Sequence, residues 1–466
     1  MRNSITEGSI LKTIFKIATP VVIANFLQTA YNLIDAIWLG RFSSEAVASV
    51  SLSFPILFLS LSIGAGFTIA GTILVAQFYG AGERKKVNWI ASQVILYLVF
   101  FSIFISIAGN LIAGPVIKLS GAKGVVAQGA VSYLKIIFSG LIFVFGFFVF
   151  QSLLRGIGIV SFPMYVVLGT VILNFIIDPI FIFGWGKIPS WGVSGAAIAT
   201  IISQGLASLV LAFVFVKGIF GIKILIKFMK PDFSFFKKVF LLGFPSALEH
   251  SVRTFSFTLI VFLIGRFGVE VVASYGIATR IFNILIIPTV GLAIAMTTLV
   301  GQNMGAGRVK RAEKISTIAC IMAFFMLTLL GFVFRAFSVP LVKIFIPMDV
   351  KVIETGAQFL KIVAWTFGFI GIQIVLGGTF RGSGNTKTAL LISIFTFILV
   401  RFSLCYFLSF HTPLKERGIF WAFALSNILG GFFSSALFLS GRWKKKKILD
   451  EFKIKKEMLE EQIEAY

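Results

Sequence analysis

Long apolar stretches recur along the chain, and short segments rich in charged residues, glycine and proline separate them. A stretch of about 20 apolar residues can cross the hydrocarbon core of a membrane as an α-helix. Reading these stretches against the breaks predicts twelve such helices, centred near Asn25, Ser62, Phe101, Phe143, Leu173, Ala207, Thr254, Ile287, Phe324, Gly368, Thr396 and Leu429. The stretches are longer than the strands of a membrane β-barrel, so the pattern predicts an all-α integral membrane protein.

The chain also repeats itself. GRFSSEAVAS begins at Gly40 and returns as GRFGVEVVAS at Gly265, which is a displacement of 225 in the numbering. RGIG at Arg155 returns as RGSG at Arg381, which is a displacement of 226. Two copies of six helices are therefore predicted. Because six is an even number, the second copy starts on the same side of the membrane, and a pseudo-two-fold axis along the membrane normal relates the two lobes.

This repeat predicts the domain organisation. We expect an N-terminal lobe over residues 1–216 with helices 1 to 6, and a cytoplasmic inter-lobe linker over 217–234. A C-terminal lobe with helices 7 to 12 should follow over 235–441, and a charged cytoplasmic tail over 442–466. The tail carries oppositely charged residues at helical spacing, which favours a solvated or membrane-surface helix.

Composition and charge agree with a multi-pass membrane protein. Hydrophobic residues make up 58% of the 466 residues, and the mean hydropathy is +0.99. The net charge of +24 is not a sign of nucleic-acid binding, because its basic residues gather in connections that follow even-numbered helices. Lysine and arginine concentrate on the cytoplasmic side of membrane proteins, so both termini are predicted to be cytoplasmic, in the cell (plasma) membrane.

Two aspartates, Asp35 and Asp178, lie inside apolar stretches. An ionisable residue in the membrane interior costs roughly 2.5 to 3.5 kcal/mol on insertion scales, so it needs a functional or structural reason. Tyr31 lies four residues before Asp35 and Asn174 four residues before Asp178, which puts each polar residue on the same helical face as its acid. The helix directions place both acids in the outer half of the membrane, where they are able to face each other.

Further oxygen-bearing residues are expected at the same depth. Tyr133 and Thr200 lie two or three turns inward on neighbouring helices, and Pro179 disturbs the carbonyl of Phe175. Carboxylates, an amide oxygen, a hydroxyl and a freed carbonyl together suit a hard cation. In the alternative interpretation, the two acids pair with Arg155 or a lysine, or share a proton, and only hold their helices together.

The second copy helps to choose between these interpretations. The positions that match Asp35 and Asp178 are Ile260 and Leu404, so the second lobe lacks both acids. If the acids only held a six-helix lobe together, the sister lobe should keep something similar.

Basic residues lie within the second copy instead. Arg253 and Arg401 fall in mid-helix, and Glu249 and His250 precede Arg253 by about one turn or less. Glu249 is four residues from Arg253 on the same helical face, so the two are predicted to form an ion pair. The alternative is a basic cleft wall that repels cations or separates the lobes.

The pattern as a whole resembles the multidrug and toxic compound extrusion (MATE) family of secondary transporters, over nearly the whole chain. The resemblance rests on four motifs: a proline, glutamine and YNLID between Pro20 and Asp35, QxxGAG in both copies, RGxG in both copies, and LNFIIDP between Leu173 and Pro179. It is closest to the branch that has its cation site in the N-terminal lobe.

This resemblance implies roles for individual residues. Members of the family like this one bind the coupling proton or sodium ion at positions that match Asp35, Asn174, Asp178 and Thr200. Substrate-cavity positions match Gln28, Tyr31 and Tyr133, and the first helix bends near the position of Pro20. Another branch uses acids in the C-terminal lobe, but the corresponding residues here are Arg253 and Ile370, which argues against ion coupling in that lobe.

These observations predict a transporter rather than an enzyme, without a cofactor. We expect a monomeric exporter that exchanges amphiphilic or cationic compounds for protons or sodium by alternating access, with membrane lipids as its surroundings and no nucleic-acid partner. The alternative is a flippase for a lipid-linked precursor in a related two-lobe fold. A third class, a non-transporting receptor, does not account for the repeat and the buried acids.

Overall fold

The computed structural model describes residues 5–446 and 448–452, and helices dominate this part of the chain. The α-helices, in chain order, are α2 (Ile10–Phe42), α3 (Ser44–Gly80), α4 (Arg84–Leu119), α5 (Gly124–Ser139), α6 (Leu141–Gly156), α7 (Ser161–Phe183), α8 (Gly192–Lys217), α9 (Phe233–Ile264), α10 (Val269–Gly305), α11 (Val309–Ala336), α12 (Ser338–Lys343), α13 (Val350–Val363), α14 (Phe367–Gly382), α15 (Thr386–Ser393), α16 (Ser403–Phe410), α17 (Glu416–Leu439) and α18 (Ile448–Glu451). Short 3-10 helices are η1 (Ile226–Phe228), η2 (Gly265–Phe267), η3 (Ala364–Thr366) and η5 (Arg442–Lys445), and η4 (Ile394–Phe402) is a π-helix.

Over the described residues, eleven helical segments are long and apolar enough to cross a membrane, and a bent helix pair brings the number to twelve. The prediction of twelve spans is therefore confirmed, with one span that is not straight. Helices α5 and α6 meet at Gly140 with an angle of 53°. A side chain at Gly140 would collide with Ile201 of α8. The glycine thus lets the bent span approach α8, the helix that carries Thr200.

The chain forms two compact units. We call Met1–Val22 with Pro245–Ile448 the C-terminal unit, and Ile23–Phe244 with Leu449–Tyr466 the N-terminal unit, as far as the described residues extend. The boundary within α2 falls near Pro20, and the boundary within α9 falls at Pro245. The two prolines are related by the same displacement in the numbering, 225, as the two copies of the repeat.

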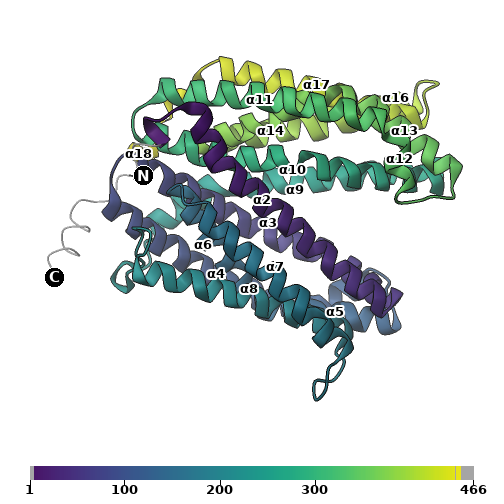
Figure 1. Ribbon diagram of the computed structural model, residues 1–466, viewed down its shortest axis with the longest axis horizontal. Helices are drawn as coiled ribbons and strands as arrows, with labels where there is room; N and C mark the ends of the chain where they lie inside the picture. Colours follow the sequence, from purple (N-terminus) through teal and green to yellow (C-terminus); the bar gives the residue numbers. More distant parts are fainter. Residues whose placement is uncertain (1–4, 447, 453–466) are drawn as a thin grey trace. The chain divides into compact units, whose positions relative to one another are not determined.

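Each unit has its own helix packing. In the C-terminal unit, α14 packs against α10, α11 and α17. Aromatic side chains of α10, α13, α14 and α17 build a buried core around Tyr275, Phe359, Phe367 and Phe420. Figure 1 shows α11, α14 and α17 running alongside one another. In the N-terminal unit, α3 packs against α4, α5 and α6, while α7 and α8 pair closely.

One span of the C-terminal unit departs from regular α-helical winding. Its central segment η4 is a π-helix that separates α15 from α16, and it carries Arg401. A π-helix inserts an extra residue into a turn and is found often at functional sites. The matching span of the first copy, α7, is α-helical throughout.

Two glycine contacts reveal the extra residue. A side chain on Gly195 would meet the backbone of Phe181, and a side chain on Gly418 would meet the backbone of Leu408. If these close approaches are equivalent, Leu408 corresponds to Phe181, and the displacement is 227 rather than the 226 seen before the π-helix. By this contact the second-copy residue that corresponds to Asp178 is Cys405 rather than Leu404. Neither residue is acidic, so the contrast between the two copies stands.

The charged tail predicted over 442–466 lies mostly outside the described residues. Arg442–Lys445 form the 3-10 helix η5, and the indole nitrogen of Trp443 donates to the Phe438 carbonyl at 3.0 Å. Trp443 also accepts a hydrogen bond at its own carbonyl from Asn385, over 3.1 Å. This part of the tail is therefore anchored to the C-terminal unit.

Candidate functional site

The two buried acids meet in the N-terminal unit. Asp35 comes from α2 and Asp178 from α7, and their side chains come within reach of each other. Asp178 is fully buried, as is Asn174 one turn before it. The Asn174 amide nitrogen donates to Asp178 Oδ1 over 2.9 Å. Two carboxylates at such close range are stable together only when they share a proton or a cation.

Aromatic packing holds α2 against α7 at this depth. The Trp38 ring lies 5.9 Å from the Phe175 ring, and the Phe42 ring lies 5.8 Å from the Phe183 ring, between ring centres. Leu39 is buried beside Ile182 in the same apolar cluster. The residues that follow Asp35 on α2 therefore fix the height at which its carboxylate faces α7.

Five buried oxygen atoms at this site have no hydrogen-bond partner among the described residues. They are the Tyr31 hydroxyl, Asp35 Oδ1, the Asn174 carbonyl oxygen Oδ1, Asp178 Oδ2 and the Thr200 hydroxyl. Tyr31 and Asp35 each come within reach of Thr200, which α8 contributes. Buried polar atoms are usually paired, because an unpaired one costs about 1 to 3 kcal/mol. Five such oxygens together suit a bound proton or a hard cation.

The donor set favours an alkali cation or a proton over a transition metal. Oxygen ligands from carboxylate, amide and hydroxyl groups suit hard cations. Within the part of the chain that the structure describes, no group of three or more His, Cys, Asp and Glu side chains is placed to hold a metal ion. The structure thus brings Asp35, Asn174, Asp178 and Thr200 together, and their role as a proton or sodium site stays a prediction.

The arrangement does not support the alternative in which a basic residue neutralises the acids. Arg155 lies on α6, where its Nη1 donates to the Gln151 side chain over 3.4 Å. The ion pairs formed by the described residues do not include Asp35 or Asp178. Of the structural alternatives, a proton shared between the two acids is the one that agrees with the described contacts.

The expected cavity and hinge residues are distributed along α2 and α5. Tyr133 of α5 lies close enough to interact electrostatically with both carboxylates. Gln28 is half-buried on α2, about two turns before Asp35. Pro20 lies inside α2, and the helix continues on both sides of it. The roles of these three residues in substrate binding and bending stay predictions.

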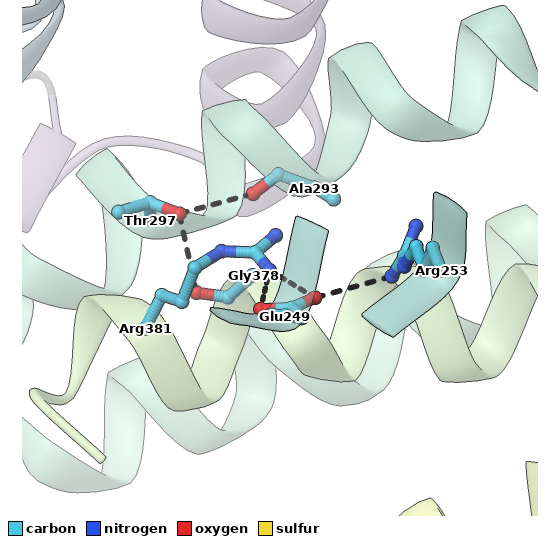
Figure 2. A network of polar contacts seen from close by, with 6 residues as sticks. All are labelled: Glu249, Arg253, Ala293, Thr297, Gly378 and Arg381. Atoms are coloured by element: carbon cyan, nitrogen blue, oxygen red, sulfur yellow. Dashed lines mark hydrogen bonds and ion pairs between the residues drawn. The ribbon is translucent and has the colours of Figure 1, made fainter. Parts of the chain in front are cut away.

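In the C-terminal unit the predicted pair between Arg253 and Glu249 is confirmed, and it has a third member. Arg253 Nη2 lies 3.1 Å from Glu249 Oε1 on α9. Arg381 Nη1, from α14, donates to both Glu249 oxygens over 2.9 Å. Figure 2 shows the two arginines on either side of the one carboxylate. The repeated RGxG motif marked Arg381 in the sequence, but nothing there linked it to Glu249.

Arg401 has different partners. Its Nε donates to the Ser426 hydroxyl over 2.8 Å, and its Nη2 donates to Asn427 Oδ1 over 2.6 Å. Both partners are neutral and lie on α17. The predicted ion pair with an acid is therefore specific to Arg253, and the described partners of Arg401 are neutral side chains that hold it against α17.

Comparison with known protein families gives two matches along the chain. The family model described as MatE matches residues 20–180 and residues 245–407. The starts of the two matched segments differ by 225 in the numbering and their ends differ by 227, so they correspond to the two copies of the repeat.

Curated relatives cover most of the chain. A protein of Thermotoga maritima named "Probable multidrug resistance protein NorM" is 28% identical over 450 residues, which are 96% of this chain and 96% of the relative. "Multidrug export protein MepA" of Staphylococcus aureus strain RF122 is 23% identical over 397 residues, which are 84% of this chain and 86% of the relative.

Solved structures have the same fold. A structure titled "Crystal structure of MATE in the bent conformation" matches with a TM-score of 0.87 and 24% identity, over 95% of this chain and 96% of that chain. Another, titled "Outward-facing conformation of a multidrug resistance MATE family transporter of the MOP superfamily", matches with a TM-score of 0.87 and 23% identity, over 95% and 98%. The all-α architecture predicted from the apolar pattern is thereby confirmed.

Proposed function

Because this chain belongs to the MatE family, we propose that it is a secondary active exporter of amphiphilic or cationic compounds, driven by inward flow of protons or sodium. The relatives described above are named for multidrug resistance and multidrug export. The observation that carries the coupling mechanism is the group of five buried, unpaired oxygens around Asp35 and Asp178.

The chemistry of this group accounts for binding and release of the ion. With one proton or one sodium ion between them, Asp35 and Asp178 no longer repel each other, and the neutral oxygens of Asn174 and Thr200 complete the shell. Without the ion, two buried negative charges attract a cationic substrate. Ion and substrate then compete for the same carboxylates, and this competition couples their movements in opposite directions.

The remaining residues of the N-terminal lobe take supporting roles in this proposal. Tyr31, Tyr133 and Gln28 offer ring faces, hydroxyls and an amide to an amphiphilic substrate near the acids. Aromatic faces attract cationic groups by about 0.5 to 2 kcal/mol. Pro20 lacks a backbone N–H, so α2 bends there more easily than elsewhere when the charge at Asp35 changes.

The topology of the proposal follows from the charge distribution. The transporter lies in the cell membrane as a monomer with both termini cytoplasmic, and the segment 217–234 links the lobes 1–216 and 235–441 on the cytoplasmic side. Basic residues of this linker and of Lys444–Lys446 accord with that orientation.

A flippase for a lipid-linked precursor is the second candidate, and Arg253 and Arg401 are the observation that favours it. A pyrophosphate headgroup would need basic side chains in the lobe. However, Arg253 shares Glu249 with Arg381, so part of this charge is already neutralised.

The deciding experiment measures drug accumulation in cells that express the protein, with the ion gradient intact and then collapsed. We expect low accumulation of an amphiphilic cation, such as ethidium, that rises to the level of empty cells when the gradient is removed. Expression without any effect on such cations would favour the flippase instead.

A further inference from the structure

A cavity of about 160 Å³ lies inside the C-terminal unit. Its walls come from α9, α10, α14, η4 and α17, and they combine phenylalanine rings with polar side chains. Arg253 and Arg401 both line it, and none of its described lining residues is acidic. The cavity therefore has the opposite electrostatic character to the site around Asp35 and Asp178.

The repeat matches positions that line this cavity with positions at or near the cation site of the first copy. The displacement of 225 matches Asp35 with Ile260 and Gln28 with Arg253, and both second-copy residues line the cavity. The corresponding position on the first helix of each copy thus carries an acid in one lobe and an apolar side chain in the other. About two turns earlier on the same helix, the neutral amide of Gln28 in the first copy is replaced by the cation of Arg253 in the second.

The carboxylate of Glu249 already has two arginine partners, Arg253 and Arg381. Its Oε1 accepts from Arg253 over 3.1 Å, and both of its oxygens accept from Arg381 over 2.9 Å, as Figure 2 shows. Arg401 is not among the described partners of this carboxylate, because its described hydrogen bonds go to neutral side chains of α17. Together, Glu249, Arg253, Arg381 and Arg401 carry three positive charges and one negative charge. This excess of positive charge favours the binding of an additional anion.

Arg401 itself is only 8% exposed. Its hydrogen bonds to Ser426 and Asn427 use Nε and Nη2, and they leave the N–H groups of Nη1 without a described protein acceptor. The guanidinium carbon lies 4.7 Å from the centre of the Phe397 ring and 4.3 Å from that of Phe423. Neutral partners and rings orient this cation but do not neutralise it, and a buried charge is costly without a counter-charge.

Tyr275 supplies an independent observation. Its side chain is 2% exposed and lines the same cavity, and its hydroxyl is buried with no hydrogen-bond partner in the described chain. It also lies within electrostatic range of Arg401. A guanidinium edge and a phenol hydroxyl that lack acceptors in one cavity are suited to the two oxygens of a carboxylate.

We propose that this cavity binds a small aromatic carboxylate, with its anionic group held by Arg401 and Tyr275 and its ring between the phenylalanines. The size agrees, because an apolar cavity of about 150 Å³ is enough to hold benzene. A phospholipid or a lipid-linked pyrophosphate is too large to be enclosed. The site extends beyond the proposed export of cations and concerns binding alone, so it is testable whether or not that function is correct.

The test is equilibrium binding of radiolabelled benzoate to the purified full chain in nanodiscs of zwitterionic lipid. We expect saturable binding that unlabelled benzoate displaces, whereas benzyltrimethylammonium, a cation of similar size, does not compete. Chloride and inorganic phosphate form two further competition arms. Weak competition by both is expected, because neither carries a ring, and complete displacement by either at equal concentration would overturn the choice of an aromatic acid.

Variants locate the site. Arg401→Gln should weaken benzoate binding by at least about tenfold, which corresponds to about 1.4 kcal/mol. Arg335→Gln is the matched control, because Arg335 also lies over an aromatic ring, at 4.8 Å from Trp365, and donates to a neutral acceptor, the Lys361 carbonyl. This control should bind benzoate as the parent does.

Tyr275→Phe keeps the proposal testable if Arg401→Gln does not fold, because it removes a hydroxyl that has no protein partner in the described chain. We expect it to fold normally and to bind benzoate at least about threefold more weakly, by loss of one hydrogen bond to a charged group. Absence of saturable benzoate binding to the parent would overturn the inference. So would parent-like affinity in folded Arg401→Gln or, if that variant does not fold, parent-like affinity in Tyr275→Phe.

Discussion

Asn174 and Asp178 lie one turn apart on α7, and the Asn174 amide nitrogen donates to Asp178 Oδ1 over 2.9 Å. The bond fixes the orientation of the carboxylate and uses only one of its oxygens. Asp178 Oδ2 and Asn174 Oδ1 are both buried without a partner in the described chain. The pair is thus set up as half of a binding site, and the proposals above predict the effects of changing it.

Asp178→Asn should fold but lose gradient-driven efflux. An asparagine oxygen is still able to accept the hydrogen bond from Asn174, so the helix packing is kept, while the exchangeable charge is lost. We expect efflux in vesicles to fall by at least about tenfold, with a melting temperature close to that of the parent. Asp349→Asn is the control, because Asp349 caps α13 by accepting from the Val352 N–H, and asparagine caps equally well. Full retained transport in Asp178→Asn would contradict the coupling proposal.

Asp35→Asn should abolish the release of the coupling ion that substrate causes. If substrate and ion compete at Asp35 and Asp178, adding substrate to the loaded parent expels protons or sodium. The measurement is the pH change of a weakly buffered protein solution, together with a sodium-sensitive dye. Equal release from the parent and from Asp35→Asn would remove Asp35 from the exchange.

Thr200→Val should distinguish sodium from proton coupling. The substitution keeps the shape but removes a neutral oxygen, which matters for coordination of a metal ion and much less for protonation of a carboxylate. If sodium is the coupling ion, the sodium concentration for half-maximal transport should rise by at least about tenfold, near 1.4 kcal/mol. If the proton is the coupling ion, the pH profile of transport should hardly move. Thr258→Val serves as the control, since Thr258 is an exposed residue that donates only to the Thr254 carbonyl.

Glu249→Gln should destabilise the fold strongly. Glu249 is buried and neutralises Arg253 and Arg381 at once, and removal of one member of a buried ion pair typically costs about 3 to 5 kcal/mol. Glu313→Gln is the matched control, because its pair with Lys444 has side chains that are 41% and 31% exposed, and a solvent-accessible pair is worth about 0 to 1 kcal/mol. Thermal unfolding in detergent measures both. A melting temperature for Glu249→Gln as high as that for Glu313→Gln would be the contrary result.

Arg253→Ala should change substrate preference or abundance and leave the ion dependence of transport unaltered. Glu249 keeps its two contacts with Arg381 in this variant, so its charge stays compensated. The check is the ion dependence of efflux for two unrelated substrates, measured at matched expression. A folded Arg253→Ala protein that no longer responds to the ion gradient would show that the C-terminal lobe takes part in coupling.

Much of the N-terminal site was predictable because its signals are local. An aspartate in an apolar stretch is conspicuous, and the spacings from Tyr31 to Asp35 and from Asn174 to Asp178 place each pair on one helical face. Helix direction placed both acids at one depth, where they are able to face each other, but the contact itself also depends on the packing of α2 against α7. The missing acid at Ile260 was visible from the repeat alone.

The arginine network was predictable only in part, because its members come from distant helices. The pair of Glu249 and Arg253 lies within one turn of α9, whereas Arg381 is 132 residues away on α14. Nothing in the local pattern indicates that the two helices meet at that height. The hydrogen bonds of Arg401 have the same origin, since they join η4 to α17.

The π-helix η4 has a genetic consequence for the C-terminal lobe. Its extra residue lies in the segment that carries Arg401, and the matching helix α7 has none. The extra residue is absorbed within η4, so loss of one codon there would return the segment to α-helical winding and leave the flanking helices α15 and α16 in register. A single in-frame deletion is thus a change that this lobe is built to accept, although scans of point substitutions never sample it.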